Sequence, residues 1–149
     1  MEKRPNILII DAQGGGIGRL LVSAVRQELP AASITAVGGN SAATAAMLKA
    51  GADQGATGEN AVVVACRGAD VILGPIGIVI ADAMLGEITP KMAAAVAQSG
   101  AKRILIPFDH CDNIVVGVHD SSMKALVKEG VTILMEMLKD GADKCRNPS

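Results

Sequence analysis

Residues 7–18 read ILIIDAQGGGIG, an apolar run that stops at Asp11 and continues into a turn with four glycines. A continuous apolar run of this kind is typical of a central parallel strand that is covered on both faces. Many α/β folds hold a phosphate with a glycine turn that leads from such a strand into a helix. The stretch therefore predicts a first strand, a ligand-binding turn and the start of a helix.

The rest of the chain alternates between strand and helix patterns. Apolar periodicity and turn residues predict strands over residues 6–10, 33–37, 70–73, 103–108 and 114–118. Apolar spacings of three and four, together with capping residues, predict helices over residues 17–29, 42–50, 59–67, 78–85, 90–99 and 121–138. Residues 52–58 are expected to form a polar glycine loop. The alternation predicts a three-layer Rossmann-like α/β domain with a mostly parallel five-stranded sheet.

The last two predicted strands are separated only by residues 109–113. Such a connection is too short for a parallel crossover, so the fifth strand is expected to pair antiparallel or to return as a hairpin. We expect a single domain over residues 6–139, with flexible ends at residues 1–5 and 140–149, because the chain of 149 residues contains no linker that would divide it.

Composition narrows the class of partner. Half of the residues are hydrophobic, an excess that indicates a homo-oligomer, and we expect its interface in the apolar region Ile76–Ile88. The chain has no Trp or Tyr and a formal net charge of −1, so it offers neither stacking platforms nor phosphate-neutralising surface for nucleic acid. Glycines and charged residues interrupt the apolar window at residues 71–88, so no membrane span is expected. An odd number of widely spaced cysteines and a charged start favour a reduced, cytoplasmic protein.

Ligands of parallel α/β sheets bind beyond the carboxyl ends of the strands, where the strand order reverses. We expect the third predicted strand to lie beside the first, so that residues 74–77 form the wall opposite the glycine turn. The expected partner is a small molecule. The candidate binding residues are Asp11, Gln13, Gly14, Gly15, Gly16, Ile17 and Gly18 in the first turn, Asn40 and Ser41 after the second strand, and Gly74, Pro75, Ile76 and Gly77 after the third.

The ordinary dehydrogenase interpretation is weakened by the second strand. An Asp or Glu at the end of that strand normally holds the ribose hydroxyls of NAD, whereas this chain has Gly38, Gly39 and Asn40 there. The chain lacks tyrosine, so the Tyr–Lys pair of short-chain dehydrogenases is absent, and it has no Gly-Lys-Ser/Thr phosphate loop. The glycine turn thus predicts a nucleotide or another phosphorylated molecule, with NAD(P) as one candidate cofactor, but no reaction.

Residues 109–112, Asp-His-Cys-Asp, form the most reactive-looking cluster of the chain. His110 and Cys111 are the candidate catalytic residues, as an imidazole beside a thiol nucleophile. The alternative is a polar turn without catalytic function. Two histidines and three scattered cysteines give no metal-ligand spacing, so no metal site is predicted.

Three functions therefore remain open. The first is binding of a nucleotide or phosphorylated small molecule at the glycine turn. The second is a Cys/His-dependent enzyme that acts on a small molecule. The third is a non-catalytic regulatory or assembly subunit, with residues 76–88 as its partner surface.

As a set, five blocks resemble an uncharacterised bacterial family, the domain of unknown function numbered 3842. They are DAQGGGIG at residues 11–18, AMLKAGA at 46–52, GATGENA at 55–61, GPIGI at 74–78 and MLGEITPKMA at 84–93. The resemblance spans about residues 6–138 and implies a small Rossmann-like protein of a family that is often labelled NAD(P)-binding. It implies no established activity and no catalytic residues.

Overall fold

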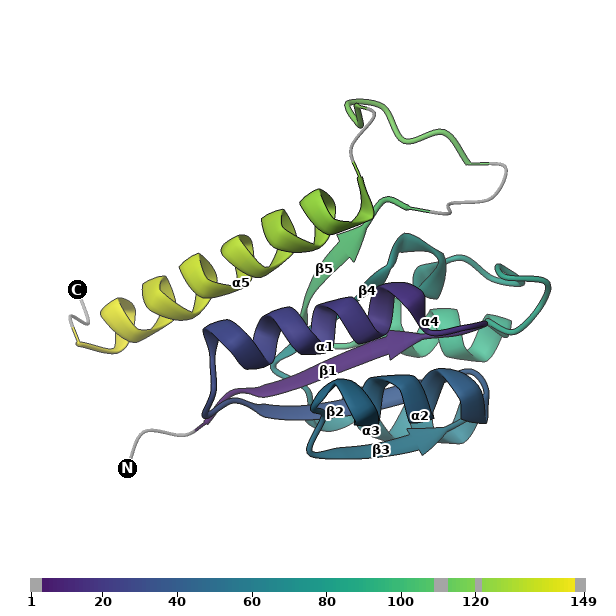
Figure 1. The fold of residues 1–149 in the computed structure, drawn as a ribbon, viewed down its shortest axis with the longest axis horizontal. Coiled ribbons are helices and arrows are strands. Elements are labelled where there is room, and N and C mark those ends of the chain that lie inside the picture. Colours follow the sequence, from purple (N-terminus) through teal and green to yellow (C-terminus); the bar gives the residue numbers. More distant parts are fainter. Residues whose placement is uncertain (1–3, 109–112, 120–121, 147–149) are drawn as a thin grey trace.

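The computed structural model describes residues 4–108, 113–119 and 122–146, the last five of these by their backbone only. In this part of the chain, one sheet of five parallel strands has the order β3-β2-β1-β4-β5 (Figure 1). The strands are β1 (Asn6–Asp11), β2 (Ser33–Gly38), β3 (Gln54–Thr57), β4 (Val71–Pro75) and β5 (Lys102–Ile106).

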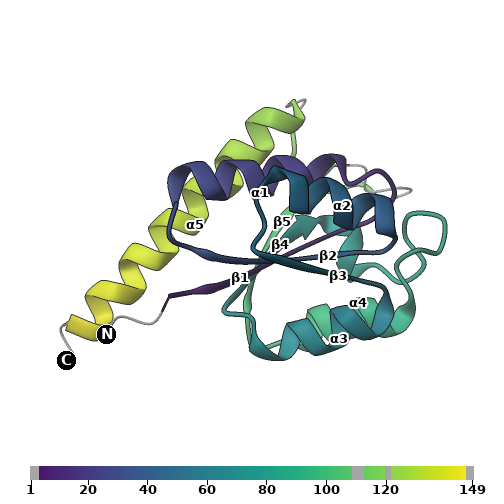
Figure 2. The same cartoon turned by 60° about the horizontal axis from the view of Figure 1, so that its bottom comes forward.

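Helices cover both faces of the sheet, which confirms the three-layer α/β prediction (Figure 2). One face carries α1 (Gly16–Glu28), α2 (Ser41–Ala50) and α5 (Met123–Arg146). The other face carries α3 (Glu59–Gly68) and α4 (Pro90–Gln98). Asn40 caps α2, Thr89 caps α4 with Pro90 at its first position, and the Ser122 hydroxyl accepts a hydrogen bond from Ala125 N–H at the start of α5.

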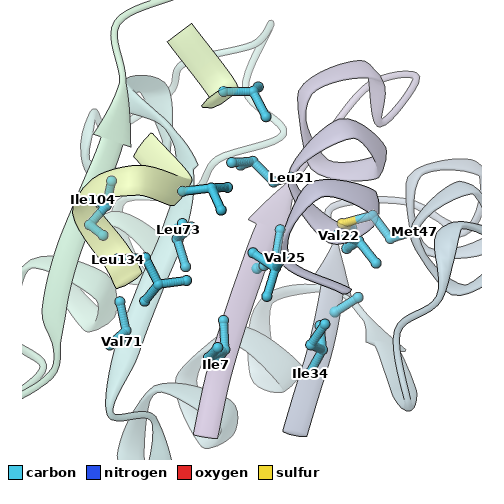
Figure 3. Packing of buried hydrophobic residues seen from close by; sticks show 14 of the residues in the cluster. Ile7, Leu21, Val22, Val25, Ile34, Met47, Val71, Leu73, Ile104 and Leu134 are labelled. Atoms are coloured by element: carbon cyan, nitrogen blue, oxygen red, sulfur yellow. The ribbon is translucent and has the colours of Figure 1, made fainter. Parts of the chain in front are cut away.

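The apolar run in β1 is buried on both faces because the sheet is covered on both. Ile7 and Ile9 point into the layer under α1 and α5, where they meet side chains such as Val25 and Leu134 (Figure 3). Leu8 and Ile10 point to the opposite layer, under α3 and α4. Burying each of these side chains stabilises the fold by about 2 kcal/mol, which makes β1 the centre of the core.

The prediction of an antiparallel or hairpin-returned last strand is wrong. The last strand, β5, pairs with β4 in parallel, and the described residues 113–119 contain no strand. Ile114 and Val116 face solvent, and Gly117 adopts a positive φ of 91° within a turn. A run of apolar residues is therefore not sufficient evidence for a strand when no sheet position is open to it.

The fifth strand of the sheet is β3, within residues 52–58, which were expected to form a loop. All four residues of β3 are exposed, so the segment carries no hydrophobic alternation that would predict a strand. Backbone pairing with β2 alone defines it, from Thr35 opposite Gln54 to Gly38 opposite Thr57.

Two predicted helices also differ from the structure. Residues 78–85 do not form a helix: a single 3₁₀ turn, η1 (Ile76–Val79), is followed by an irregular loop in which Asp82, Met84 and Leu85 have positive φ. Helix α5 continues to Arg146, beyond the expected end at Leu138. No helix in the described part of the chain is both long enough and apolar enough to span a bilayer.

The strand order reverses between β1 and β4. Chain connections from β1 lead outward to β2 and β3 on one side, and β4 leads to β5 on the other. The predicted placement of strand 70–73 beside the first strand is thus confirmed by the pairing of Ile7, Leu8 and Ile9 with Val71, Ile72 and Leu73. The carboxyl ends of β1 and β4 flank the position where ligands of parallel α/β sheets bind.

Candidate functional site

The glycine turn, residues 11–18, joins β1 to α1 through two left-handed residues. Gln13 has a φ of 52° and Gly15 a φ of 71°. The Gly15 amide donates to the carbonyl of Ala12 at 3.0 Å, which closes the turn, and α1 begins at Gly16. Glycine is required at position 15 because a side chain would be strained at this φ and would also meet the backbone of Ala43 at 3.0 Å.

The four glycines of the turn have different roles. A Cβ atom at Gly18 would lie 2.6 Å from Met47 Sδ and 2.8 Å from Asp11 Cβ, so the packing of α1 against α2 and β1 excludes a side chain. At Gly14 and Gly16, a Cβ atom would meet nothing within 4 Å, and neither residue has a positive φ. The fold therefore explains Gly15 and Gly18 but not Gly14 and Gly16.

Asp11 is a buried carboxylate that organises the turn from inside. Its two oxygens accept hydrogen bonds from Ala12 N–H at 2.8 Å and Gly18 N–H at 2.7 Å. Burial raises the pKa of Asp11, because desolvation outweighs the backbone hydrogen bonds from Gly18, Ala12 and Ile17, and the nearby charge of Glu87 adds to the increase. The carboxylate thus takes up amides in the first turn of α1 that a phosphate would otherwise contact.

Glu87 fixes the outer side of the turn. Its carboxylate accepts hydrogen bonds from Gln13 N–H at 2.7 Å and from Asn40 Nδ2 at 2.6 Å. The Asn40 side-chain amide also donates to Gln13 O at 2.8 Å, while its oxygen accepts from Ala43 N–H to cap α2. Asn40 therefore ties α2, the glycine turn and the loop before α4 together, and both polar atoms of its side chain are already engaged.

Two backbone amides of the turn stay available. Within the part of the chain that the structure describes, neither Gly14 N–H nor Gly16 N–H donates a hydrogen bond. Gly14 is exposed and Gly16 is half-buried. These amides belong to the positive end of α1, where an anion is stabilised by both the hydrogen bonds and the helix dipole.

A hollow of about 100 Å³ lies next to these amides. It is lined on one side by the glycine turn and on the other by the side chains of Pro75, Met84, Phe108 and Met123. Its floor is at the carboxyl ends of β1 and β4, where the strand order reverses. The backbone of the glycine turn on one wall thus faces an apolar wall on the other. Two of the four residues in the apolar wall are methionines, whose flexible side chains can adapt to the shape of a ligand.

The remaining candidate residues are distributed unevenly around this hollow. Pro75 lines it, whereas Gly74 packs closely against the carbonyl of Ile10 and the side chain of Ile78, and Gly77 lies against Met84. Ser41 is exposed in the first turn of α2. The structure therefore brings Pro75 to the glycine turn and gives Gly74 and Gly77 packing roles.

Sequence reasoning did not assign Glu87, Met84, Phe108 and Met123 to the site. The last three line the hollow, and Glu87 lies more than seventy residues after the amide that it binds. A single acid in an irregular loop carries no local signal for such a contact. The strand order places the segment after β4, which carries Met84 and Glu87, beside the segment after β1, while Phe108 follows β5 and Met123 begins α5.

The reactive-looking cluster cannot be placed, because His110 and Cys111 lie outside the described residues. Cys66 is a free, buried cysteine, and burial raises the pKa of its thiol, which makes it unreactive. Among the described residues, no three His, Cys, Asp or Glu side chains come together as metal ligands.

Comparison with known proteins gives similar solved structures and one family. Curated proteins give no match. One solved structure with a similar fold is a dodecameric FMN-dependent Ubix-like decarboxylase from Escherichia coli O157:H7, with 17% sequence identity and a TM-score of 0.46 over 89% of this chain and 94% of that chain. A likeness at this level concerns the fold alone and says nothing about the ligand or the assembly of this chain. The family model of the domain of unknown function DUF3842 matches residues 6–139, and the chain therefore belongs to this family.

Proposed function

We propose that the protein binds a small molecule with an anionic group, a nucleotide or another phosphorylated metabolite, at the glycine turn. The anionic group accepts hydrogen bonds from the amides of Gly14 and Gly16. The rest of the ligand extends along the rim of the hollow, on the side of the apolar residues Met84, Phe108 and Met123. NAD(P) and flavin nucleotides are among the ligands with this combination of groups.

The observation that carries the proposal is the pair of glycines that the fold does not need. Gly14 and Gly16 have open space where a side chain would lie, ordinary backbone angles and amides without a partner among the described residues. Each glycine costs up to about 1 kcal/mol of backbone entropy relative to alanine. A ligand that approaches the backbone closely accounts for both positions.

The size of the hollow limits what enters it. Its volume of about 100 Å³ is below the 300–1,000 Å³ that is usual for pockets that enclose a whole drug-sized ligand. The hollow therefore receives one group of the ligand, of about phosphate size, and the rest of the ligand extends along the rim. The Asp11 and Glu87 carboxylates hold the turn in the conformation that presents the two amides, so little ordering is left to the ligand.

Thermal-shift titration with NAD, NADP, FMN, ATP, sugar phosphates and inorganic phosphate tests this function. A ligand at a hundred times its dissociation constant stabilises the folded protein by about 2.7 kcal/mol. Gly16→Glu is the informative variant, because an acid in the first turn of a helix is compatible with the fold but repels an anionic ligand.

Gly100→Glu is the matched control. A Cβ atom at Gly100 would likewise meet nothing within 4 Å. Gly100 precedes β5 and so lies at the end of the sheet where the parallel strands begin, opposite the end that carries the glycine turn. We expect the ligand-induced shift to be lost in Gly16→Glu and kept in Gly100→Glu. Loss in both variants, or in neither, contradicts the assignment of the site.

A specific observation also favours another of the three functions, that of an assembly subunit with residues 76–88 as its partner surface. Leu85 is 98% exposed, at a left-handed φ of 58°, on the irregular loop beside the site. A large apolar side chain held in a strained, fully exposed conformation is suited to contact another subunit. Leu85→Asp is expected to reduce the mass of the assembly in light scattering, and an unchanged mass would remove this candidate's support.

A further inference from the structure

A groove between α1 and α5 is lined by Leu20 and Ala24 of α1 and by Val127, Lys128, Val131 and Glu136 of α5, among others, and it shares no lining residue with the hollow at the glycine turn. It is a hollow of about 740 Å³ on the helical face of the sheet that also carries α2. Val127 and Val131 form its buried floor, and Met135 is exposed at its side. We call it the α1–α5 groove.

The exposed ridge of α5 in this groove has an ordered charge pattern. Lys124, Lys128, Thr132 and Glu136 follow one another at intervals of four residues and therefore lie along one line of the helix. The two lysines lie toward the start of α5, and Glu136 lies toward its end, where Glu28 at the end of α1 joins it. The groove thus has two lysines at one end and, at the other, the acids Glu28 and Glu136 together with Lys139, so the charges of the two ends have opposite net sign.

These charges form no ion pairs within the part of the protomer that the structure describes. The single ion pair among the described residues joins Arg26 and Asp53, so none involves Lys124, Lys128, Glu28 or Glu136. The pattern is also antisymmetric about Thr132: position 128 is four residues before it and position 136 four residues after it. A second α5 that runs antiparallel across Thr132 would place Lys128 of each copy opposite Glu136 of the other.

We infer that the α1–α5 groove is the interface of a two-fold symmetric dimer, in which α5 of each copy lies in the groove of the other. The acidic end formed by Glu28 and Glu136 receives the basic end formed by Lys124 and Lys128 of the second copy. Such self-complementarity is what a two-fold interface requires. A small-molecule ligand would leave the opposite charges at the two ends unexplained.

The length of α5 agrees with this arrangement. Leu134 is the last fully buried residue among the side chains of α5 that the structure describes, up to Gly141, and the helix continues to Arg146 and extends beyond the sheet (Figure 1). Of residues 135–141, Met137 and Leu138 are half-buried and the other five are exposed. An overhanging helix of this kind gains a packing partner when a second copy lies beside it.

Charge reversal tests the dimer with the full chain. Lys128→Glu places like charges opposite each other at both symmetry-related contacts, and Glu136→Lys does the same with the opposite sign. Each variant alone is expected to raise the dissociation constant of the dimer on the order of tenfold in sedimentation experiments, a change of about 1.4 kcal/mol. Both side chains are exposed, so the fold is retained, which circular dichroism verifies.

The decisive experiment measures the association of Lys128→Glu mixed with Glu136→Lys. In a mixed dimer, each reversed charge faces an opposite charge, so the mixture is expected to associate at least as tightly as the unmodified protein. Lys91→Glu, an exposed charge reversal on α4 at the other face of the sheet, is expected to change nothing. Contacts elsewhere, such as those of residues 76–88, do not produce this pairing.

Two outcomes would overturn the inference. The first is an unmodified protein that stays monomeric at all concentrations, which would leave the groove to a different occupant. The second is a mixture of the two variants that associates no more tightly than either variant alone.

Discussion

Asp11 and Asp53 are two carboxylates whose pKa values move in opposite directions. Burial raises the pKa of Asp11 above its ordinary value of 3.8. Hydrogen bonds from Ile34 N–H, and then from Arg26, lower the pKa of the exposed Asp53 below the same value. The two residues therefore contribute to stability with opposite dependence on pH.

For Asp11, the folded state binds more protons than the unfolded state between pH 3.8 and the raised pKa. The free energy of unfolding of the unmodified protein, measured relative to Asp11→Asn, should thus be largest below pH 3.8 and fall as the pH rises through the folded pKa. Denaturant unfolding at a series of pH values checks this. A difference that grows with pH would contradict the burial argument.

The contribution of Asp53 to stability is expected to depend on pH in the opposite direction, which Asp53→Asn tests. Because its folded pKa is lowered, the contribution of Asp53 is present above pH 3.8 and is lost as the pH falls. The stability difference between the unmodified protein and Asp53→Asn should therefore shrink toward acid pH, in the same unfolding experiment.

Alanine substitutions separate the glycines of the fold from those assigned to the ligand. Gly18→Ala forces a Cβ atom against Met47 and Asp11 and should destabilise the protein by about 1 to 3 kcal/mol. Gly16→Ala meets open space and should be neutral or stabilising by up to about 1 kcal/mol. Equal losses of stability in the two variants, measured by urea unfolding, would refute this division.

At the scale of elements, the loop before α4 is held to the glycine turn chiefly through Glu87. Asp82, Met84 and Leu85 within it have positive φ, a conformation that costs each residue about 1 to 2 kcal/mol. Glu87→Gln turns a side-chain NH₂ toward one of the two donors, Gln13 N–H or Asn40 Nδ2, and so loses a charge-assisted hydrogen bond.

We expect Glu87→Gln to destabilise the protein by about 1 to 3 kcal/mol. Hydrogen exchange should accelerate at the amides of residues 82–88 and of Gln13, while β1 keeps its protection. Glu129→Gln, an exposed position on α5, serves as control and should alter neither. Acceleration spread evenly over the whole sheet would indicate global destabilisation instead.

Elements were predictable where burial imposes a pattern on the chain. β1 reads as a buried parallel strand because both of its faces are covered, and α2 and α4 begin where Asn40 and Thr89 supply caps. β3 was missed because its four exposed residues are ordered only by pairing with β2. Residues 78–85 were mistaken for a helix because their apolar character reflects the burial of Ile78, Ala83 and Met84 in an irregular segment, with Leu85 exposed, rather than helical periodicity.

For the molecule as a whole, the sequence allowed the three-layer architecture and the position of the glycine turn to be predicted. The strand order places the turn after β1 beside Pro75 at the end of β4, as expected from the rule for parallel sheets. The contribution of Glu87 and the engagement of Asn40 were not predictable, since both arise from contacts between segments far apart in the chain.

The central claim is that the free amides of Gly14 and Gly16 hold the anionic group of a ligand. Titration of ¹⁵N-labelled protein with the ligand that stabilises it most tests this directly. The account predicts that the amide resonances of Gly14 and Gly16 shift most, while that of Gly18, already bonded to Asp11, shifts little. Largest shifts in the α1–α5 groove, or none at the glycine turn, would contradict it.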